Sequence, residues 1–344
     1  MATKTIKIRI KDSTSAKTLK NMSRSVNFVW NYCNETSFKA IRYNSEWLSG
    51  YDLQKLTTGS GKELGINSTT VQEVCSEYAL RRKQFKKRKL RWRGKKSLGW
   101  IPFKKTGITF KCGFVKYAGH SFKVFQPDRL PGKGEYGSGE LCEDASGRWY
   151  LCIAVEYEPE YQAGKGEVGI DLGLKDLASL SNGEKVVNGR YYRMMERKLK
   201  RAQRYGKKKQ ARHLHRKIRN KRMDALHKAS TAIVKKNALV VVGKIGAKKL
   251  AKTKMAKSVN DAGMSMFKTM LKYKASAQQH CIFVEVPENF STQICSNCLA
   301  VSGPKGPKDL GVREWVCSSC GAVHDRDVNA ALNILRFGRE SLVS

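Results

Sequence analysis

Four cysteines in the last fifth of the chain have the spacing of a metal site. Cys295 and Cys298 lie in QICSNC, and Cys317 and Cys320 lie in WVCSSC, which gives the pattern C-x2-C-x18-C-x2-C. Two CxxC pairs bring four thiolates within tetrahedral reach of one Zn2+. Because four thiolates leave no open coordination position, we expect this zinc to hold a loop and to take no part in chemistry.

Two further segments place carboxylates where a catalytic metal could bind. Asp171 ends an apolar run in VGIDLGLKDLA, and Asp325 and Asp327 lie in HDRDVNAALNIL, just after the last cysteine of the CxxC pairs. Each acid also has an ordinary structural interpretation. An Asp at a strand end often forms a turn, and carboxylates suit the N-terminus of the helix predicted after Asp327. From these residues alone both interpretations stay open.

The charge of the chain indicates a polyanionic partner. The 67 Lys and Arg outnumber the 29 Asp and Glu, which leaves a net charge of +38. On a folded protein such a surplus repels itself unless nucleic acid or another polyanion lies against it. With 40% hydrophobic residues in 344, the chain can bury a core and should fold.

The basic residues gather in two segments, 81–96 and 190–222, with 11 Lys or Arg in 16 residues and 16 in 33. The ordinary interpretation of such a run is a solvated face, but so little compensating acid favours phosphate contacts. Aromatic residues in the first run could stack on bases or pack on their own domain. The candidate nucleic-acid contacts are Lys87, Arg88, Arg91, Trp92, Arg93, Arg201, Arg204, Arg212, Arg216, Arg219 and Arg222.

Membrane and secreted classes fit the sequence poorly. No apolar run approaches the roughly 18 residues of a membrane span, and the opening MATKTIKIRI has no signal-peptide block. Six of the ten cysteines stand singly, mostly in apolar runs, which favours free thiols in a reducing compartment. We therefore expect a cytoplasmic protein with no membrane partner.

Hydrophobic periodicity divides the chain near Gly164. Before it, residues 4–10 alternate as a strand, residues 14–40 and a segment from about Ser68 have helical spacing, and residues 107–157 contain short strands of a small barrel or sheet that the first strand could join. After it, GEVGID, ALVVVG and HCIFVEV suit strands covered on both faces, with basic helical sequence between the first two. The second part is therefore predicted to be α/β.

The order of these motifs resembles the TnpB family, transposon-encoded RNA-guided nucleases related to type V CRISPR effectors and Fanzor. GIDLGLKDLA, VPENFSTQICSNC and HDRDVNAALNI carry the resemblance, with EDASGRWYLCIAVE and a looser likeness before it. The resemblance implies an α/β fold with a RuvC nuclease core of RNase H type. Its implied domains are a wedge-like β-barrel at 1–12 and 97–163, a helical recognition domain at 13–96, the RuvC core at 164–290 and 325–344, and an inserted zinc ribbon at 291–324.

The resemblance also implies that an Asp, a Glu and an Asp bind two Mg2+ ions. Asp171 matches the first and Asp327 the third, but Gly243 in ALVVVGKIG stands where the family usually has the Glu. Fanzor proteins and some TnpB relatives place a Glu seven residues before the first zinc cysteine, and Glu288 has that spacing from Cys295. We expect Glu288 to be the second ligand.

Three alternatives remain at this site. Asp325 replaces Asp327 if the register is off by two, Glu285 within HCIFVEV is a rival to Glu288, and Glu288 could be an ordinary salt-bridged loop residue. In the last case Gly243 would mark an inactive nuclease.

The function implied by the resemblance is an RNA-guided, Mg2+-dependent DNA endonuclease. A guide RNA from its own locus would direct it to double-stranded DNA beside a short flanking motif, and base pairing would read the sequence. The alternatives are a nuclease-dead RNA-guided repressor, a compact type V CRISPR effector, and a zinc-ribbon protein that uses no guide. The oligomeric state is left open.

Overall fold

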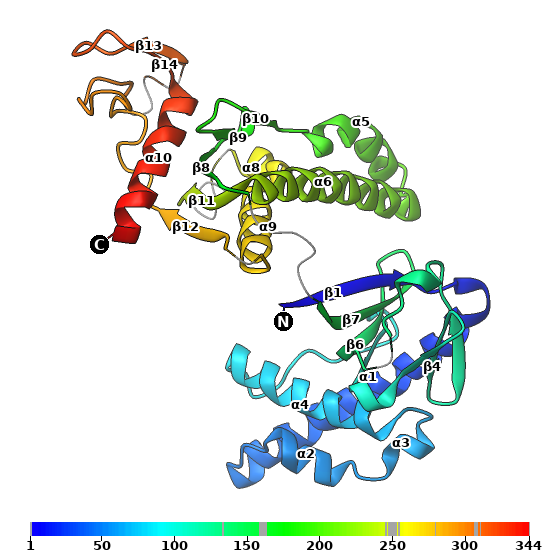
Figure 1. Cartoon of the computed structure of the whole chain (residues 1–344). Helices are drawn as coiled ribbons and strands as arrows, with labels where there is room; N and C mark the ends of the chain where they lie inside the picture. Colours follow the sequence, from blue (N-terminus) through cyan, green and yellow to red (C-terminus); the bar gives the residue numbers. More distant parts are fainter. Residues whose placement is uncertain are drawn as a thin grey trace. The chain divides into compact units, whose positions relative to one another are not determined.

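A computed structural model describes residues 2–132, 134–157, 164–244, 246, 253, 255–278, 280–305, 309 and 311–343. The chain divides into two compact units, Met1–Glu158 and Pro159–Ser344 (Figure 1). Residues 158–163, most of the loop that precedes the boundary predicted near Gly164, lie outside the described residues.

The helices of the first unit follow the predicted periodicity. α1 (Asp12–Asn44) buries Leu19, Val26 and Cys33, and α4 (Ser68–Phe85) packs against it. Two short helices, α2 (Gly50–Leu56) and α3 (Ser60–Glu63), lie between them in the sequence and contact α4. The helix spacing over 14–40 and from residue 68 is thus confirmed, but α4 ends before most of the first basic run.

The strands of the first unit form two sheets. One has the order β1-β7-β6-β2, with β1 (Ala2–Arg9), β7 (Trp149–Tyr157), β6 (Tyr136–Glu143) and β2 (Trp100–Phe103). The other contains β3 (Thr109–Lys111), β4 (Phe114–Tyr117) and β5 (His120–Lys123). Short 3-10 turns lie at Lys105–Gly107 and Pro127–Arg129. β1 pairs antiparallel with β7, so the first strand joins the later strands as its alternation indicated.

The second unit is built on one mixed sheet of order β10-β9-β8-β11-β12. Its strands are β8 (Gly166–Leu172), β9 (Asp176–Leu180), β10 (Lys185–Val187), β11 (Asn237–Gly243) and β12 (Ile282–Val286). β8, β11 and β12 run parallel, whereas β9 and β10 are antiparallel additions that the sequence reasoning did not identify. The prediction of an α/β fold is confirmed.

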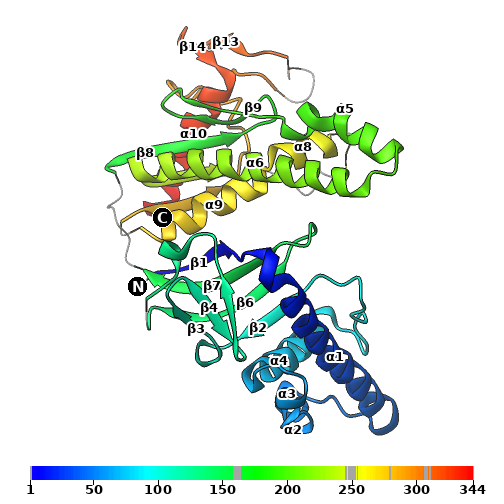
Figure 2. The same cartoon turned by 90° about the vertical axis from the view of Figure 1, so that its right-hand side faces the viewer.

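Helices cover both faces of this sheet. On one face lie α6 (Lys208–Lys236) and α9 (Met264–Ser276), and on the other lies α10 (Arg326–Val343), as the two views show (Figures 1 and 2). α5 (Tyr191–Arg204) packs on α6, and α8 (Ala256–Ala262) contacts α5. A small hairpin of β13 (Glu314–Val316) and β14 (Val323–Asp325) precedes α10. Among the described helices, none has the length and apolarity of a membrane span.

Candidate active site and metal cluster

The sheet of the second unit brings the predicted acids toward one edge. Asp171 stands near the end of β8, and Glu288 follows β12 by two residues. Because β8, β11 and β12 are parallel, their carboxyl ends meet at the same edge, where sites of α/β proteins form. α10 approaches β8 so closely that a Cβ on Gly169 would lie 2.0 Å from the carbonyl oxygen of Ala331. Ala331 and Leu335 thus lie directly against β8, and Asp327 lies in the first turn of the same helix.

Asp171 is buried near the negative charges of the other two acids. Burial raises the pKa of Asp171 well above its ordinary value, and the negative charges of Glu288 and Asp327 raise it further, against an opposing effect of Arg326. Burial likewise raises the pKa of Glu288 to about 7, while Lys268 acts in the opposite direction. Clustered carboxyl groups with raised pKa values are typical of functional sites, because a bound cation would relieve the repulsion.

Glu288 occupies the space that a side chain at position 243 would need. A Cβ on Gly243 would lie 2.4 Å from Oε1 of Glu288 and 2.6 Å from its Cγ. Oε1 is buried without a hydrogen-bond partner in the described part of the chain, which is costly for a carboxylate unless a cation or water binds it. The donor set therefore fits Mg2+, which prefers carboxylate and water oxygens.

The acids stand wider apart than the thiols of the CxxC pairs. Within the described ranges, Asp171, Glu288 and Asp327 do not form a group whose ligand atoms all lie within 4.8 Å of one another, whereas the four cysteines do. Mg2+ usually keeps several of its waters, so the carboxylates need not all touch one ion.

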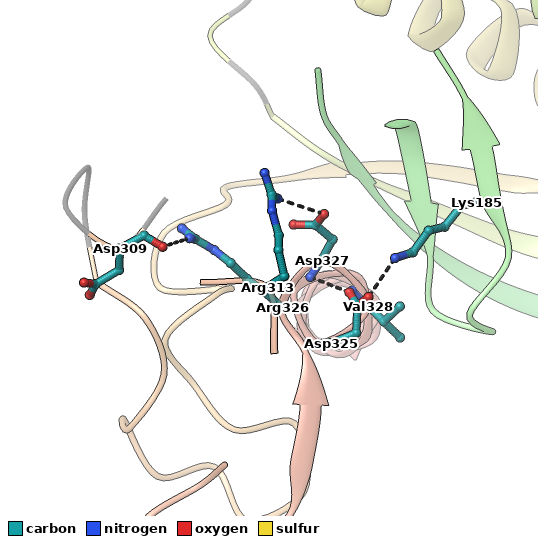
Figure 3. A network of polar contacts seen from close by, with 7 residues as sticks. All are labelled: Lys185, Asp309, Arg313, Asp325, Arg326, Asp327 and Val328. Atoms are coloured by element: carbon teal, nitrogen blue, oxygen red, sulfur yellow. Dashed lines mark hydrogen bonds and ion pairs between the residues drawn. The ribbon is translucent and has the colours of Figure 1, made fainter. Parts of the chain in front are cut away.

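The two aspartates of DRD have different surroundings (Figure 3). Oδ1 of Asp325 accepts hydrogen bonds from the backbone N–H groups of Asp327 (2.9 Å) and Val328 (3.0 Å), and Oδ2 accepts one from Nζ of Lys185 (2.7 Å). Burial alone would raise the pKa of Asp325, but the Lys185 and backbone hydrogen bonds outweigh it and hold the pKa below its ordinary value. Asp325 thus caps α10, the structural role that its position allowed.

Asp327 lies two residues after Asp325, in the first turn of α10, and its carboxylate has fewer polar contacts. Its Oδ2 is 3.4 Å from Nη1 of Arg313, and its charge acts on Asp171. The neighbouring Arg326 donates to the carbonyl oxygen of Asp309, which ties the start of α10 to the loop before β13 (Figure 3). Of the two aspartates, Asp327 is the one whose carboxylate remains available to a metal.

Glu285, the rival of Glu288, lies inside β12 beside Val242 of β11. Its Oε2 is paired with Nζ of Lys268 at 2.9 Å. The Glu285 carboxylate is therefore already engaged by a cation. The charges that raise the pKa of Asp171 are those of Glu288 and Asp327, not that of Glu285.

The four CxxC cysteines come together as the spacing predicts. Their ligand atoms all lie within 4.8 Å of one another, with Sγ separations of 3.7 Å for Cys295 and Cys320 and 3.6 Å for Cys298 and Cys317. Hydrogen bonds, the largest effect being that of Ser302, lower the pKa of Cys317 to about 5, which favours the thiolate that zinc needs. Four thiolates at this separation fit Zn2+.

The sequence reasoning missed one neighbour of this cluster. Nε2 of His324 lies 3.0 Å from Sγ of Cys295, and its ring lies 4.7 Å from that of Trp315. The signal was present, since His324 directly precedes DRD and follows Cys320 by four residues.

The candidate nucleic-acid residues of the first basic run differ in their environment. Lys87, Arg88, Arg91 and Trp92 follow α4 and are exposed. Arg93 instead donates to Oδ1 of Asn27 (2.7 Å) and lies over the rings of Trp30 and Trp100, so contacts within its own unit hold its guanidinium.

The second run forms α5 and α6 with a break at Gly206, whose φ is +63°. Here too one candidate is held internally, because Arg222 pairs with Asp261 at 2.8 Å and Asp261 is 5% exposed. Arg216 is half-buried and contacts Nδ1 of His213 at 3.0 Å. The candidates that present exposed side chains are Arg201, Arg204, Arg212 and Arg219.

Comparisons with known proteins relate most of this chain to one group. The family model OrfB_IS605, described as "Probable transposase", matches residues 150–254, and the model "Cas12f1-like, TNB domain" matches residues 265–334. A chain in the cryo-EM structure of a Cas12f1–sgRNA–target DNA complex aligns with 97% of this chain and 99% of its own length, at 17% identity and a TM-score of 0.38.

Curated relatives are described as RNA-guided DNA endonucleases or as TnpB-like proteins. A "Putative RNA-guided DNA endonuclease" of Streptomyces pristinaespiralis is 31% identical over 310 residues, which cover 86% of this chain and 75% of the relative. InsQ of Escherichia coli, with the same description, is 29% identical over 57% of this chain and 55% of its own length. The TnpB-like protein L79 of a mimivirus is 29% identical over 57% of this chain and 42% of its own length. With a relative of 31% identity matched over three quarters of its length, this chain belongs to the TnpB family.

Proposed function

We propose that this chain is an RNA-guided DNA endonuclease that cuts double-stranded DNA beside a short flanking motif with a RuvC-type, two-metal Mg2+ site. Asp171, Glu288 and Asp327 are the proposed metal ligands. The observation that carries the proposal is the fit of Glu288 into the space left by Gly243, next to the repelling carboxyl groups of Asp171 and Asp327. Its support from relatives is the shared description as RNA-guided DNA endonucleases.

The chain's own residues would prepare this site in three ways. Burial keeps water from screening the carboxylates of Asp171 and Glu288, so a divalent cation gains more by binding there. Lys268 favours the ionised form of Glu288. The cap formed by Asp325 orients the first turn of α10 and with it Asp327. When bound, Mg2+ ions would activate water and stabilise the leaving oxygen of the phosphodiester.

The proposed domains follow the predicted boundaries. The RuvC core comprises 164–290 and 325–344, and 291–324 is a ribbon in which Zn2+ bound by four thiolates stabilises the loop between Glu288 and Asp327. The barrel segments 1–12 and 97–163 and the helical segment 13–96 would recognise the flanking motif and the folded part of the guide.

Guide RNA from the chain's own locus is the proposed partner that reads the target. The exposed arginines of α5 and α6 suit the phosphates of an RNA or RNA–DNA duplex, which carry charge but little sequence information. Target choice would then rest on base pairing between guide and DNA.

The test uses the full chain co-expressed with RNA from its locus. A plasmid carrying the guide's target beside a randomised flank is incubated with the complex, with and without Mg2+. Glu288→Ala is compared with Glu285→Ala, a matched control because Glu285 is a nearby Glu already paired with Lys268. We expect guide- and Mg2+-dependent cleavage that is lost in Glu288→Ala and kept in Glu285→Ala.

Each departure from this result has a definite meaning. Guide-dependent binding of the target without cleavage by the unmodified protein would show a nuclease-dead DNA-binding regulator. Cleavage that survives in Glu288→Ala would remove Glu288 from the metal ligands. Sequencing of the RNA that copurifies would show whether the guide comes from the flank of the gene, as proposed, or from a CRISPR array.

A further inference from the structure

Three potential metal ligands lie together on the four-stranded sheet of the first unit. Glu140 and Cys142 are two residues apart on β6 and therefore project from the same face, and Cys152 on β7 is directly opposite Glu140. The Sγ atoms of Cys142 and Cys152 are 3.5 Å apart, and one ligand atom from each of the three residues lies within 4.8 Å of the others. The positions are set by strand pairing, so these side chains converge without any loop rearrangement.

The separation of the sulfur atoms fits a metal better than a disulfide. Two thiolates bound tetrahedrally to one Zn2+ at about 2.3 Å lie about 3.8 Å apart. The sulfurs of the C-terminal cysteine cluster, at 3.6 and 3.7 Å, have the same spacing. A disulfide requires about 2.05 Å, so Cys142 and Cys152 would have to approach by more than an ångström.

The two thiols also affect each other's ionisation. A hydrogen bond between them raises the pKa of Cys142 and lowers that of Cys152. Lys7, which is paired with Cys152 across β1 and β7, lowers the pKa of Cys152 as well, although burial opposes both effects. A thiolate is the form that binds a soft cation, so metal binding would displace the thiol protons.

The carboxylate of Glu140 is already oriented. Nε1–H of Trp100 on the neighbouring strand β2 donates to Oε2 of Glu140 at 2.8 Å. Such an outer hydrogen bond to a ligating carboxylate is a regular feature of protein metal sites and strengthens them.

An ion can reach the three residues from solvent. Cys142 and Cys152 are half-buried, and Glu140 and Cys152 line a pocket of about 890 Å3 in the first unit. Residues of α4 and of the segment after it line the same pocket, among them Glu77 and Trp92. The position left open by three protein ligands would therefore face this pocket.

We propose that Cys142, Cys152 and Glu140 form a second metal site, separate from the cysteine cluster of the second unit, which binds one thiophilic divalent cation such as Zn2+. Two sulfurs favour Zn2+ over Mg2+, because soft ligands select against hard cations. With three protein ligands and the positive charge of Lys7 nearby, the site binds its ion more weakly and exchanges it faster than the four-thiolate cluster. The inference does not depend on nuclease activity.

The test counts metal ions on the full chain, purified with a thiol-free reductant and saturated with Zn2+. We expect two thiolate-bound Zn2+ per chain, of which a mild chelator removes one; an ion held only by the carboxylates of the second unit gives no thiolate band after exchange for Co2+. Co2+ added after this step should enter the vacated site and give a thiolate-to-metal charge-transfer band. Cys142→Ser and Cys152→Ser should each lose the exchangeable ion and the band. Glu140→Gln should weaken Co2+ binding by about tenfold or more, since even outer-shell changes lower affinity about 10–100-fold.

Cys112→Ser is the matched control, because Cys112 is an exposed cysteine of the same unit and is not part of the cluster. It should keep both ions. If a Cys142 or Cys152 variant fails to fold, alkylation of the unmodified protein decides, since bound Zn2+ should protect both thiols and chelation should expose them. A single Zn2+ per chain, a second ion that persists in both variants, or a Cys142–Cys152 disulfide that forms in place of metal binding would overturn the proposal.

Discussion

At the carboxyl edge of the central sheet, the side chain of Glu288 fills the space that a side chain at position 243 would need. β11 and β12 pair in parallel up to Gly243 and Val286, and the chain beyond Val286 folds so that Glu288 lies over the glycine. A Cβ at position 243 would lie 2.4 Å from Oε1 of Glu288 and 2.9 Å from its Cδ. The missing Glu at position 243 and the presence of Glu288 are therefore one structural feature.

Gly243→Ala should inactivate the nuclease without unfolding the protein. The added methyl group displaces the Glu288 carboxylate, and a misplacement of about 1 Å can lower a rate about 100-fold. Plasmid cleavage by the guide complex measures the effect, with Gly311→Ala as control because a Cβ there meets nothing within 4 Å. The double variant Gly243→Glu with Glu288→Gly should recover part of the activity, and an unimpaired Gly243→Ala enzyme would contradict the shared-space argument.

Substitution of Asp325 should lower the stability of the protein, whereas substitution of Asp327 should abolish cleavage. Asp325→Ala removes a helix cap, which lowers the free energy of unfolding by about 0.5–2 kcal/mol. Asp327→Ala removes only a long ion pair with Arg313, worth about 0–1 kcal/mol, but it should abolish cleavage. Urea unfolding and plasmid cleavage distinguish the two. Loss of cleavage in a stably folded Asp325→Ser variant, which keeps a capping side chain, would reverse the assignment.

The strands, helices and cysteine cluster that could be predicted from the sequence are those with a recognisable pattern within a short segment. The alternation or apolarity of single segments located β1, β7, β8, β11 and β12, and helical spacing located α1 and α4. The cysteine spacing was sufficient to predict the four-thiol cluster. Short, half-polar strands such as β9 and β10 were missed because their pattern becomes clear only from pairing with β8.

What the sequence could not predict depends on tertiary contacts. Asp325 and Asp327 are separated by a single residue, and only the hydrogen bonds at the start of α10 distinguish the cap from the metal candidate. The space beside Gly243 that Glu288 fills could not be predicted from the sequence, because it depends on the pairing of β11 with β12. In the same way, Cys142 and Cys152 stood singly in the sequence, and strand pairing brings their sulfurs together.

Asp261 should be a main determinant of the stability of the second unit. It accepts hydrogen bonds from the backbone N–H groups of Tyr192 and Arg193 and pairs with Arg222, so it joins α8 to α5 and α6. Removing one partner of a buried pair leaves the other uncompensated, so Asp261→Asn should lower the free energy of unfolding by about 3 kcal/mol. Urea unfolding measures it. Adding Arg222→Met should increase the loss by less than that variant's own effect, and full additivity would show that the two side chains act independently.

The exposed arginines of α6 should contribute to RNA affinity through charge. Replacing Arg212 or Arg219 with Gln should lower affinity for the guide and reduce the slope of log affinity against log salt by about 0.7–0.9 for each phosphate that is no longer neutralised. Filter binding across a salt series measures the slope. Lys228→Gln is the control, since Lys228 is on the same helix but paired with Asp224 at 2.8 Å. Equal slopes for the unmodified chain and the Arg variants would exclude these side chains from the interface.

Lys274 should make the stability of the second unit depend on alkaline pH. Its Nζ donates to the carbonyl oxygen of His227 and to the hydroxyls of Ser230 and Thr231, and burial lowers its pKa to about 8. In the unfolded chain a lysine titrates near 10.4, so between about pH 8 and 10.4 the unfolded state binds more protons and the contribution of Lys274 to stability rises with pH. Below about pH 8 both states are protonated and this contribution is constant.

The comparison that isolates this effect is the unmodified chain against Lys274→Met, by urea unfolding at about pH 7 and about pH 10. The unmodified chain should gain stability relative to the variant at the higher pH. Lys272→Met, which removes an exposed lysine from the same helix, controls for the change in net charge. If the stability difference between the unmodified chain and Lys274→Met is the same at both pH values, folding does not lower the pKa of Lys274.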